Sequence, residues 1–336
     1  METTARQKSM SATQARSART KAAGDRPWQD ASRDTVSRLA KRVRKRAKAI
    51  DGSVGVDAVH DMRTATRRLR TAIKLHAEDA PRKRRTRVED ELKRVADRLG
   101  VVRDLDVLLQ TLDGTAANDR GAAEQGDIEP LREAWQTERA AGARRLKAEI
   151  ARPRFRRCLR TAQRLVVADD AASSHGASAA NAETSRVATQ APGLIWDAFG
   201  AVLAYEGDPR TADPAVIHEL RIAAKKLRYT LEAFEDALEP GATLIEDVTA
   251  LQDAAGSMHD AIVAGERARS TVPPRDLTRG QQQAIDKYAD GQARLAEQQR
   301  PAIARRLRTI RSRAFRESLG RAVAGMGHVN RPLGTS

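Results

Sequence analysis

The sequence predicts an all-α fold made of a duplicated helical unit, and three observations carry that prediction. Of the 336 residues, 32% are charged, 40% are apolar and only 3% are aromatic. Alanine, leucine, arginine, lysine and glutamate favour helices, whereas a β-rich fold needs more β-branched and aromatic residues. Apolar residues recur at helical spacing along most of the chain. Finally, segments of the first half recur in the same order in the second half.

The first two helices are defined by their turn residues. One helix is expected to open at Asp34 or Ser37 and to end at the turn pair Asp51-Gly52. The next is expected from about residue 57 to 79, because Pro81 cannot continue a helix.

Several shorter helices are expected to follow in the first half. Residues 81–99 form one, since proline suits a helix start and Gly100 suits a helix end. Residues 102–112 form a short fourth helix, and residues 113–127 a loop rich in glycine and alanine. Two more helices follow, divided by Pro153.

The domain organisation follows from composition. A stretch rich in serine, alanine and asparagine separates two periodic regions, and the same order of elements restarts with a weakly charged, buried helix over residues 187–205. We therefore expect a disordered basic arm at 1–30, a first helical half at 31–170, a linker at 171–186, a second helical half at 187–325 and a disordered tail at 326–336.

The duplication is visible in the letters themselves. The segment VHDMRTATRRLRT, which contains His60, matches IHELRIAAKKLRYT, which contains His218, 158 positions later (218 − 60). The segment ADRLGVVRDLDV (96–107) parallels QDAAGSMHDAIV (252–263), and RPRFRRCLRTA with Phe155 parallels RSRAFRESLGRA with Phe315. A period this long excludes a solenoid and indicates two related helical halves.

The repeated helix separates its cations from its apolar residues. With the histidine at 0°, the cations fall within an arc of roughly 80°, and the apolar residues cluster about 160° to 220° away. Like charges at this spacing repel one another, so a ligand that neutralises them is the natural explanation for building the pattern twice. The predicted binding residues, called here the stripes, are His60, Arg63, Arg67, Arg70 and Lys74 in the first half, and His218, Arg221, Lys225 and Arg228 in the second.

The chemistry of the stripes points to a linear polyanion. The chain carries a formal net charge of +16, which indicates an anionic partner. The arginine fork matches phosphate oxygens in pairs, lysine adds a point charge, and histidine supplies a further donor near neutral pH. A row of such groups suits several linked phosphates better than one phosphate.

At these residues the sequence resembles the CHAD family, the conserved histidine α-helical domain. The motif H-x-x-R-x-x-x-[KR]-[KR]-L-R, present twice, is supplied by residues 60–70 and 218–228, and the Leu-Gly…Asp segments around Asp104 and Asp260 are similar to the second marker of that family. The resemblance covers about residues 31–325. It implies two pseudo-symmetric four-helix bundles enclosing a basic cavity, and non-enzymatic binding of inorganic polyphosphate, with an association with polyphosphate granules in the cytoplasm. Weaker candidates, where the two halves differ or the position lies off the stripe, are Arg68, Lys226, Arg103 and His259.

Three other functions compete with this one. Non-specific RNA or DNA binding fits the net charge, but no aromatic pattern for base stacking is present, so only weak affinity is expected. Metal chelation is disfavoured because the stripe histidines have no histidine or cysteine four residues on and stand among cations. An enzyme would need clustered carboxylates or an activated nucleophile; Asp104 and Asp260 are interpreted instead as helix-terminus or ion-pair residues.

The sequence also suggests a compartment. A single cysteine, Cys158, excludes a disulfide framework and fits a reducing environment. We expect neither a secretory signal nor a membrane span, and no cofactor or metal.

Overall fold

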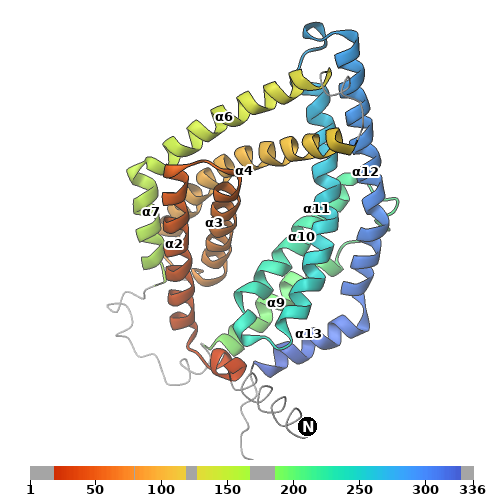
Figure 1. Ribbon diagram of the computed structural model, residues 1–336. Helices are drawn as coiled ribbons and strands as arrows, with labels where there is room; N and C mark the ends of the chain where they lie inside the picture. Colours follow the sequence, from red (N-terminus) through yellow and green to blue (C-terminus); the bar gives the residue numbers. More distant parts are fainter. Residues whose placement is uncertain (1–18, 79, 119–126, 167–185, 327–336) are drawn as a thin grey trace, which may run out of the picture. The chain divides into compact units, whose positions relative to one another are not determined.

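The computed structural model describes residues 19–78, 80–118, 127–166 and 186–326, and these are helical nearly throughout (Figure 1). An all-α fold is therefore confirmed, with no strand among the described residues and one isolated bridge between Pro27 and Arg186. The α-helices are α2 (Trp28–Gly52), α3 (Val56–His76), α4 (Arg82–Asn118), α6 (Glu129–Ala151), α7 (Pro153–Arg164), α9 (Val187–Leu203), α10 (Pro214–Ala233), α11 (Gly241–Thr271), α12 (Arg279–Arg311) and α13 (Arg313–Gly325).

The chain groups into two compact units that interleave along the sequence. Unit 1 comprises residues 1–34, 168–255 and 301–336, and unit 2 comprises 35–167 and 256–300. The long helices α11 and α12 are each divided between the units. Residues 256–300 thus group with the first half of the sequence, so the compact units do not coincide with the two repeated halves.

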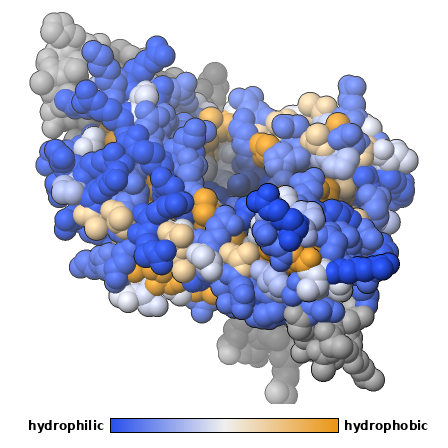
Figure 2. Space-filling view, turned by 90° about the horizontal axis from the view of Figure 1, so that it is seen from above, coloured by the Kyte–Doolittle hydropathy of each residue, from blue (hydrophilic) through white to orange (hydrophobic). Residues whose placement is uncertain are grey.

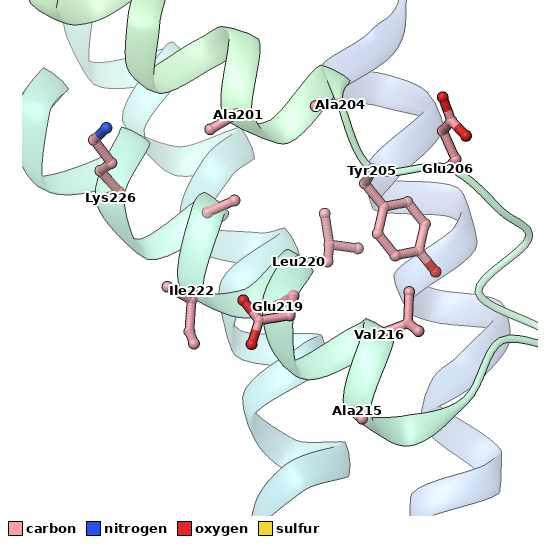
Figure 3. A pocket seen from close by; sticks show the side chains of 11 residues that line it. Ala201, Ala204, Tyr205, Glu206, Ala215, Val216, Glu219, Leu220, Ile222 and Lys226 are labelled. Atoms are coloured by element: carbon pink, nitrogen blue, oxygen red, sulfur yellow. The ribbon is translucent and has the colours of Figure 1, made fainter.

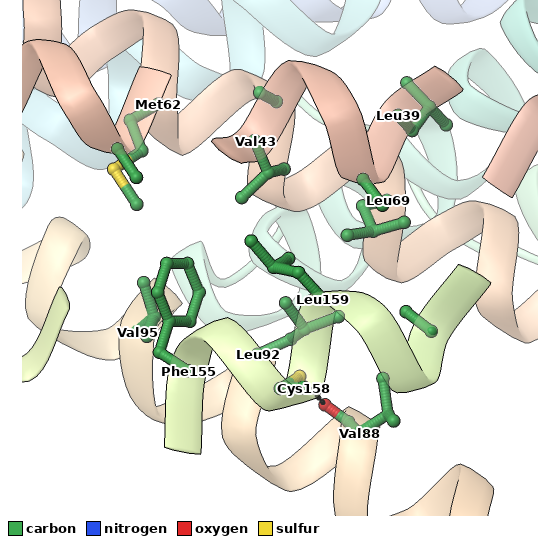
Figure 4. Close-up of a cluster of buried hydrophobic side chains, with 14 of the residues drawn as sticks. Leu39, Val43, Met62, Leu69, Val88, Leu92, Val95, Phe155, Cys158 and Leu159 are labelled. Atoms are coloured by element: carbon green, nitrogen blue, oxygen red, sulfur yellow. Dashed lines mark hydrogen bonds between the residues drawn. The ribbon is translucent and has the colours of Figure 1, made fainter. Parts of the chain in front are cut away.

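Unit 2 has a main core formed by α2, α3, α4 and α7 (Figure 4). Val43 of α2, Leu69 of α3, Leu92 of α4 and Leu159 of α7 are almost completely excluded from solvent. Each such side chain stabilises the fold by about 1.5–3 kcal/mol relative to an exposed position. Packing against α2, α4 and α7 therefore fixes the orientation of α3, the first of the repeated helices.

A second core of unit 2 lies between the C-terminal part of α4, the N-terminal part of α6, and parts of α11 and α12. Leu112 of α4, Leu131 and Trp135 of α6 and Ala264 of α11 are buried together, and Tyr288 of α12 contacts the Trp135 ring edge-on. The indole Nε1 of Trp135 donates a hydrogen bond of 2.9 Å to Thr271 Oγ1. The polar atom of this large side chain is therefore satisfied, as burial requires.

Unit 1 is built around α9 and α10, which pack against each other. The rings of Phe199 in α9 and Phe315 in α13 stack with centroids 5.7 Å apart, and Trp28 stacks on Phe234 at 6.0 Å. The weakly charged segment is a largely buried helix, as predicted, although it ends at Leu203.

Two predicted breaks in the first half are wrong. Helix α4 runs unbroken from Arg82 to Asn118, through Gly100 and into the expected loop at 113–127. Val95, Leu99 and Val102 continue one buried stripe across the glycine, and packing of that stripe outweighs the weak preference of glycine to end a helix. A Cβ atom at Gly100 would meet no atom within 4 Å, so the position does not require glycine.

The described ends of the chain also differ from expectation. Residues 19–24 are helical and α2 begins at Trp28, although both fall in the region predicted as a disordered arm. The Trp28–Phe234 contact supplies the apolar packing that orders this start. The first 18 residues, the predicted linker apart from Arg186, and the tail after Met326 lie outside the described residues.

Candidate functional site: two cationic stripes

The stripes lie on α3 and α10, on the side of each helix away from its core. Met62, Leu69 and Ile73 of α3 are completely buried, as are Leu227 and Leu231 of α10. These are the apolar positions that the helical periodicity assigned to the core, so that assignment is confirmed. The stripe residues follow on the opposite arc of each helix, where solvent or a ligand can reach them.

The stripe side chains are exposed or half-buried, and none is fully buried. In α3, His60 and Lys74 are exposed and the three arginines are half-buried; in α10, all four stripe residues are half-buried. Within the described part of the chain, Arg70, Lys74 and Arg221 form no ion pair. Stems that pack against the protein explain why these arginines are half-buried. The Nε atoms of Arg67 and Arg228 are buried, so an anion could contact these two only through their terminal nitrogens.

Arg228 departs from this pattern because it already has partners in the chain. Its Nε lies 3.1 Å from Glu232 Oε1, one turn further along α10, and both side chains are mostly buried. Its guanidinium also lies 5.0 Å from the centre of the Tyr229 ring. Part of its charge is thus neutralised, so it has less to offer a polyanion than an arginine without such an ion pair.

The start of α3 is held by a buried ion pair on neighbouring helices. Asp106 of α4 is 1% exposed and accepts a hydrogen bond of 2.5 Å from Arg139 Nε of α6. The same arginine donates through NH2 to the carbonyl of Val54 at 3.0 Å, just ahead of the helix. The N-cap residue Gly55 offers no side-chain cap, so Arg139 fixes the chain where the first stripe begins.

The start of α10 is held in a different way. The Asp213 side chain accepts a hydrogen bond of 2.8 Å from the Ala215 backbone N–H, and Pro214 occupies the first helical position. This is a local cap that the sequence encodes within three residues. The two repeated helices therefore present similar stripes but begin by unrelated means.

A group of charges surrounds Arg63 in unit 2. The pKa of Asp104 is raised, first because neighbouring protein desolvates its carboxylate and further because Asp260 is close, while Arg63, Arg267 and Arg103 oppose the rise. Both aspartates lie inside helices, α4 and α11, so the first of their two interpretations, as helix-terminus residues, is wrong, and the ion-pair interpretation remains. Acidic side chains thus stand beside the first stripe.

The weaker candidates fall outside the stripes. Arg103 belongs to the charge group around Asp104, and His259 lies half-buried on α11. Arg68 and Lys226 sit about 80° from the histidine of their helix, beyond the cationic arc. In Figure 3, Lys226 borders a largely apolar groove of about 620 Å³ between α9 and α10, whose lining includes Ala201, Tyr205, Val216 and Ile222.

Other chemistry finds little support among the described residues. They contain no group of three or more histidine, cysteine or acidic side chains that would hold a metal ion. Burial, and then the charge of Glu91, raise the pKa of Cys158 to about 12. The thiol therefore stays protonated at neutral pH and is not a nucleophile; it packs in the main core with its Sγ 3.7 Å from the Val88 carbonyl oxygen.

Comparison with known families identifies the fold. The family model described as the CHAD domain matches residues 38–269, more than half of the chain. The chain belongs to the CHAD family. This CHAD chain is also 32% identical, over 224 residues, to an uncharacterized protein of Mycobacterium tuberculosis H37Rv. That match covers 62% of this chain and 39% of the relative, so this chain spans well under half the length of that protein.

Solved CHAD structures show the same fold. The CHAD domain from the plant Ricinus communis superimposes with a TM-score of 0.58 at 22% identity, covering 91% of this chain and 93% of that one. PptA from Streptomyces chartreusis superimposes with a TM-score of 0.59 at 19% identity, covering 84% and 99%. These likenesses establish the architecture of the chain.

Sequence reasoning missed two features of this site. Asp106 stands four residues after Val102 and seven after Leu99, at a core position of its helix, and an acid there signals a buried partner. No sequence signal identifies Arg139, 33 positions away, as that partner.

In the described part of the chain, no helix is long and apolar enough to cross a membrane.

Proposed function

We propose that this CHAD chain binds inorganic polyphosphate through the stripes of α3 and α10, without catalysis. The observation that carries the proposal is the repeated arrangement of histidine and cations on two helices, each on the arc opposite a fully buried apolar face. A merely solvated surface has no physical reason to repeat that arrangement at the same spacing. Membership of the CHAD family supports the same ligand class, and a cytoplasmic location at polyphosphate granules belongs to this proposal.

The test compares two stripe variants with a matched control. One variant carries Arg63→Gln and Arg67→Gln, and the other carries Arg221→Gln and Lys225→Gln. The control carries Arg316→Gln and Arg321→Gln, which remove the same charge from exposed positions of α13. Binding of fluorescent long-chain polyphosphate is titrated at several salt concentrations, and circular dichroism confirms that each variant is folded.

Each stripe variant is expected to bind at least about tenfold more weakly near physiological salt, because the cations that displace counterions from the polymer are removed. The slope of log affinity against log salt should become shallower by about one for each phosphate that the variant no longer neutralises. The control should stay close to wild type. Equal weakening in all three variants would show that net charge alone attracts polyphosphate, and the stripe proposal would then fail.

The absence of catalysis is tested with the same material. Polyphosphate incubated with the wild-type chain, with and without Mg²⁺, should keep its length on gels and release no free phosphate. Shortening of the polymer that disappears in the stripe variants would instead identify an enzyme.

A further inference from the structure

A second strongly charged surface covers the outer faces of α2 and α7 in unit 2, on helices that carry no stripe. We propose that this surface binds the phosphate backbones of a double-stranded nucleic acid without reading its sequence. Its exposed cations are Arg38, Lys41, Arg42, Arg44, Lys45 and Lys48 on α2, and Arg156, Arg157, Arg160 and Arg164 on α7. These residues are called here the α2/α7 face.

The two helices lie side by side, so their cations form one surface. Gln163 of α7 donates a hydrogen bond of 3.4 Å to Ser37 Oγ of α2, and both helices contribute to the main core of unit 2. Figure 1 shows them running in opposite directions. Adjacent helices pack with axes about 8–10 Å apart, and the cations extend about 15 Å along α2 and about 12 Å along α7.

The charge on this surface is not balanced by ion pairs in the described part of the chain. No acidic residue occurs between residues 35 and 50 or between 152 and 164. Among the described residues, none of the cations of the α2/α7 face forms an ion pair. The nearby Arg46 and Arg154, by contrast, are paired with Asp61 and with Glu91 and Glu149. The neighbouring acids are therefore already engaged with cations that lie outside the face.

The duplication provides an internal comparison. The element corresponding to α2 is α9, which contains no lysine or arginine and carries Asp197. The element corresponding to α7 is α13, where Glu317 lies 2.6 Å from Arg313. The stripes occur in both halves, but this second basic surface occurs in one half only, so it is independent of the repeated stripes.

The geometry favours a duplex over other polyanions. Two rows of cations on adjacent helices can contact the two phosphate backbones that border a groove, whereas a single polyphosphate chain can follow only one row at a time. Arginine and lysine without base-contacting side chains give backbone binding that is independent of sequence. Phe155 of α7 is buried, and Trp28 of α2 lies outside the α2/α7 face and stacks on Phe234, so the face itself has no exposed aromatic side chain for stacking single-stranded bases.

A membrane surface is a poorer match. Peripheral membrane helices combine a basic face with exposed large apolar residues. In the described part of the chain, the exposed large apolar residues are Val101, Trp196, Val216, Ile222 and Leu295, and none belongs to α2 or α7. In the view of Figure 2, hydrophilic side chains dominate the surface and apolar ones are scattered.

The test removes charge from the face and from a matched place in unit 1. The face variant carries Lys41→Gln, Lys45→Gln, Arg157→Gln and Arg160→Gln. The matched control carries Arg305→Gln, Arg308→Gln, Arg316→Gln and Arg321→Gln, all at exposed positions. Fluorescence anisotropy measures binding of duplex DNA of about 20 base pairs, in two unrelated sequences, near physiological salt. Long-chain polyphosphate and vesicles of anionic phospholipid are measured beside it.

The face variant should bind duplex DNA about tenfold or more weakly, for both sequences alike, and its salt slope should become shallower by about three to four. Its polyphosphate affinity should stay within about twofold of wild type, and the matched control should bind DNA normally. The stripe variants should show the reverse pattern, so failure of the polyphosphate proposal and failure of this one are separable.

Four results would each overturn the inference. The first is an equal drop of DNA affinity in the matched control, which would mean that net charge alone is responsible. The second is loss of DNA binding only in the stripe variants. The third is a drop of polyphosphate affinity in the face variant as large as its drop in DNA affinity, which would make the face part of the polyphosphate site. The fourth is binding to vesicles but not to duplex DNA.

Discussion

His76 shows how one histidine can be structural while two others are candidate ligands. It lies 16 residues after His60, which places it about 160° around α3 and within the apolar arc. The structure buries it, with 7% of its surface exposed, and burial lowers its pKa from 6.5 to about 4. Its counterpart in the second half, 158 positions later, is Phe234 in the core of unit 1.

The lowered pKa of His76 predicts destabilisation in acid. Between pH 6.5 and about 4, His76 is protonated in the unfolded chain but not in the folded chain, so the free energy of unfolding falls as pH falls. The full effect is about 3 kcal/mol, reached near the lower pKa. Urea unfolding of wild type and His76→Gln at several pH values between 7 and about 4.5 measures it. The variant should show a clearly weaker pH dependence, and an unchanged slope would contradict the assignment.

Asp104 is expected to weaken the first stripe. Its carboxylate lies near Arg63, where its negative charge opposes a bound polyanion. Across about 4 Å of water one such charge is worth about 1 kcal/mol, so Asp104→Asn should raise polyphosphate affinity about two- to fivefold at neutral pH. Because the pKa of Asp104 is raised, the wild-type carboxylate takes up a proton at a higher pH than an ordinary aspartate, and the two proteins should converge in mild acid.

A matched substitution separates this local effect from net charge. Asp90→Asn removes the same charge from an exposed position on the same face of α4, about 21 Å away. It should change affinity little. If both variants bind polyphosphate equally tightly, or if the gain of Asp104→Asn persists unchanged in acid, Asp104 does not act on the stripe.

At the scale of the helices, α3 and α10 differ in how the start of each is held in place. Asp213 and Pro214 are local signals that the sequence places next to each other. The Asp106–Arg139–Val54 link instead joins α4 and α6 to the segment ahead of α3. Only packing brings these groups together, which is why helical periodicity predicted α3 but not the link that holds its start.

Breaking the Asp106–Arg139–Val54 link should destabilise the fold. Arg139→Met leaves the Asp106 carboxylate buried without its cation and the Val54 carbonyl without its donor, which should destabilise the fold by about 3 kcal/mol. Replacing both residues, as Arg139→Met with Asp106→Leu, should recover much of that stability because no charge remains buried. Urea unfolding measures both changes, and Arg144→Met at an exposed position of α6 is the control. A double variant no more stable than the single one would contradict this account.

In α4, the packing of buried side chains outweighs the tendency of Gly100 to end the helix. From the sequence, Gly100 divided residues 81–112 into two helices, because glycine is a frequent stop. The buried stripe of Val95, Leu99 and Val102 instead runs across it. On α6, an added Cβ at Gly142 would lie 3.4 Å from both Val101 and Val102, which is ordinary van der Waals contact, so this position too does not require glycine.

At the scale of the whole molecule, the duplication predicts how the stripes cooperate. If one polyphosphate chain engages both stripes, reversing charge in either half should weaken binding nearly as much as reversing both. The variants are Arg63→Glu with Arg67→Glu, and Arg221→Glu with Lys225→Glu. Calorimetry with short polyphosphate should give one chain per protein. Two equal sites, with each variant losing one and keeping the other at full affinity, would contradict a shared site.

The sequence by itself determined the fold class, the duplication, the two repeated helices and which of their faces are apolar. These are periodic properties, since position along a helix sets direction around it, and a histidine such as His60 or His76 can be placed on one arc or the other by counting. The resemblance in motif and order identified the family that the comparison then confirmed.

The tertiary structure decided what depends on residues distant in the sequence. It grouped residues 256–300 with the first half, buried the Asp106–Arg139 pair and brought Asp104 close to Asp260. It also brought α2 and α7 together into one cationic surface, although the hydrogen-bonded Ser37 and Gln163 lie 126 positions apart. Periodicity describes one helix at a time, whereas contacts between helices follow from how their side chains fit together, and only the folded chain makes those contacts.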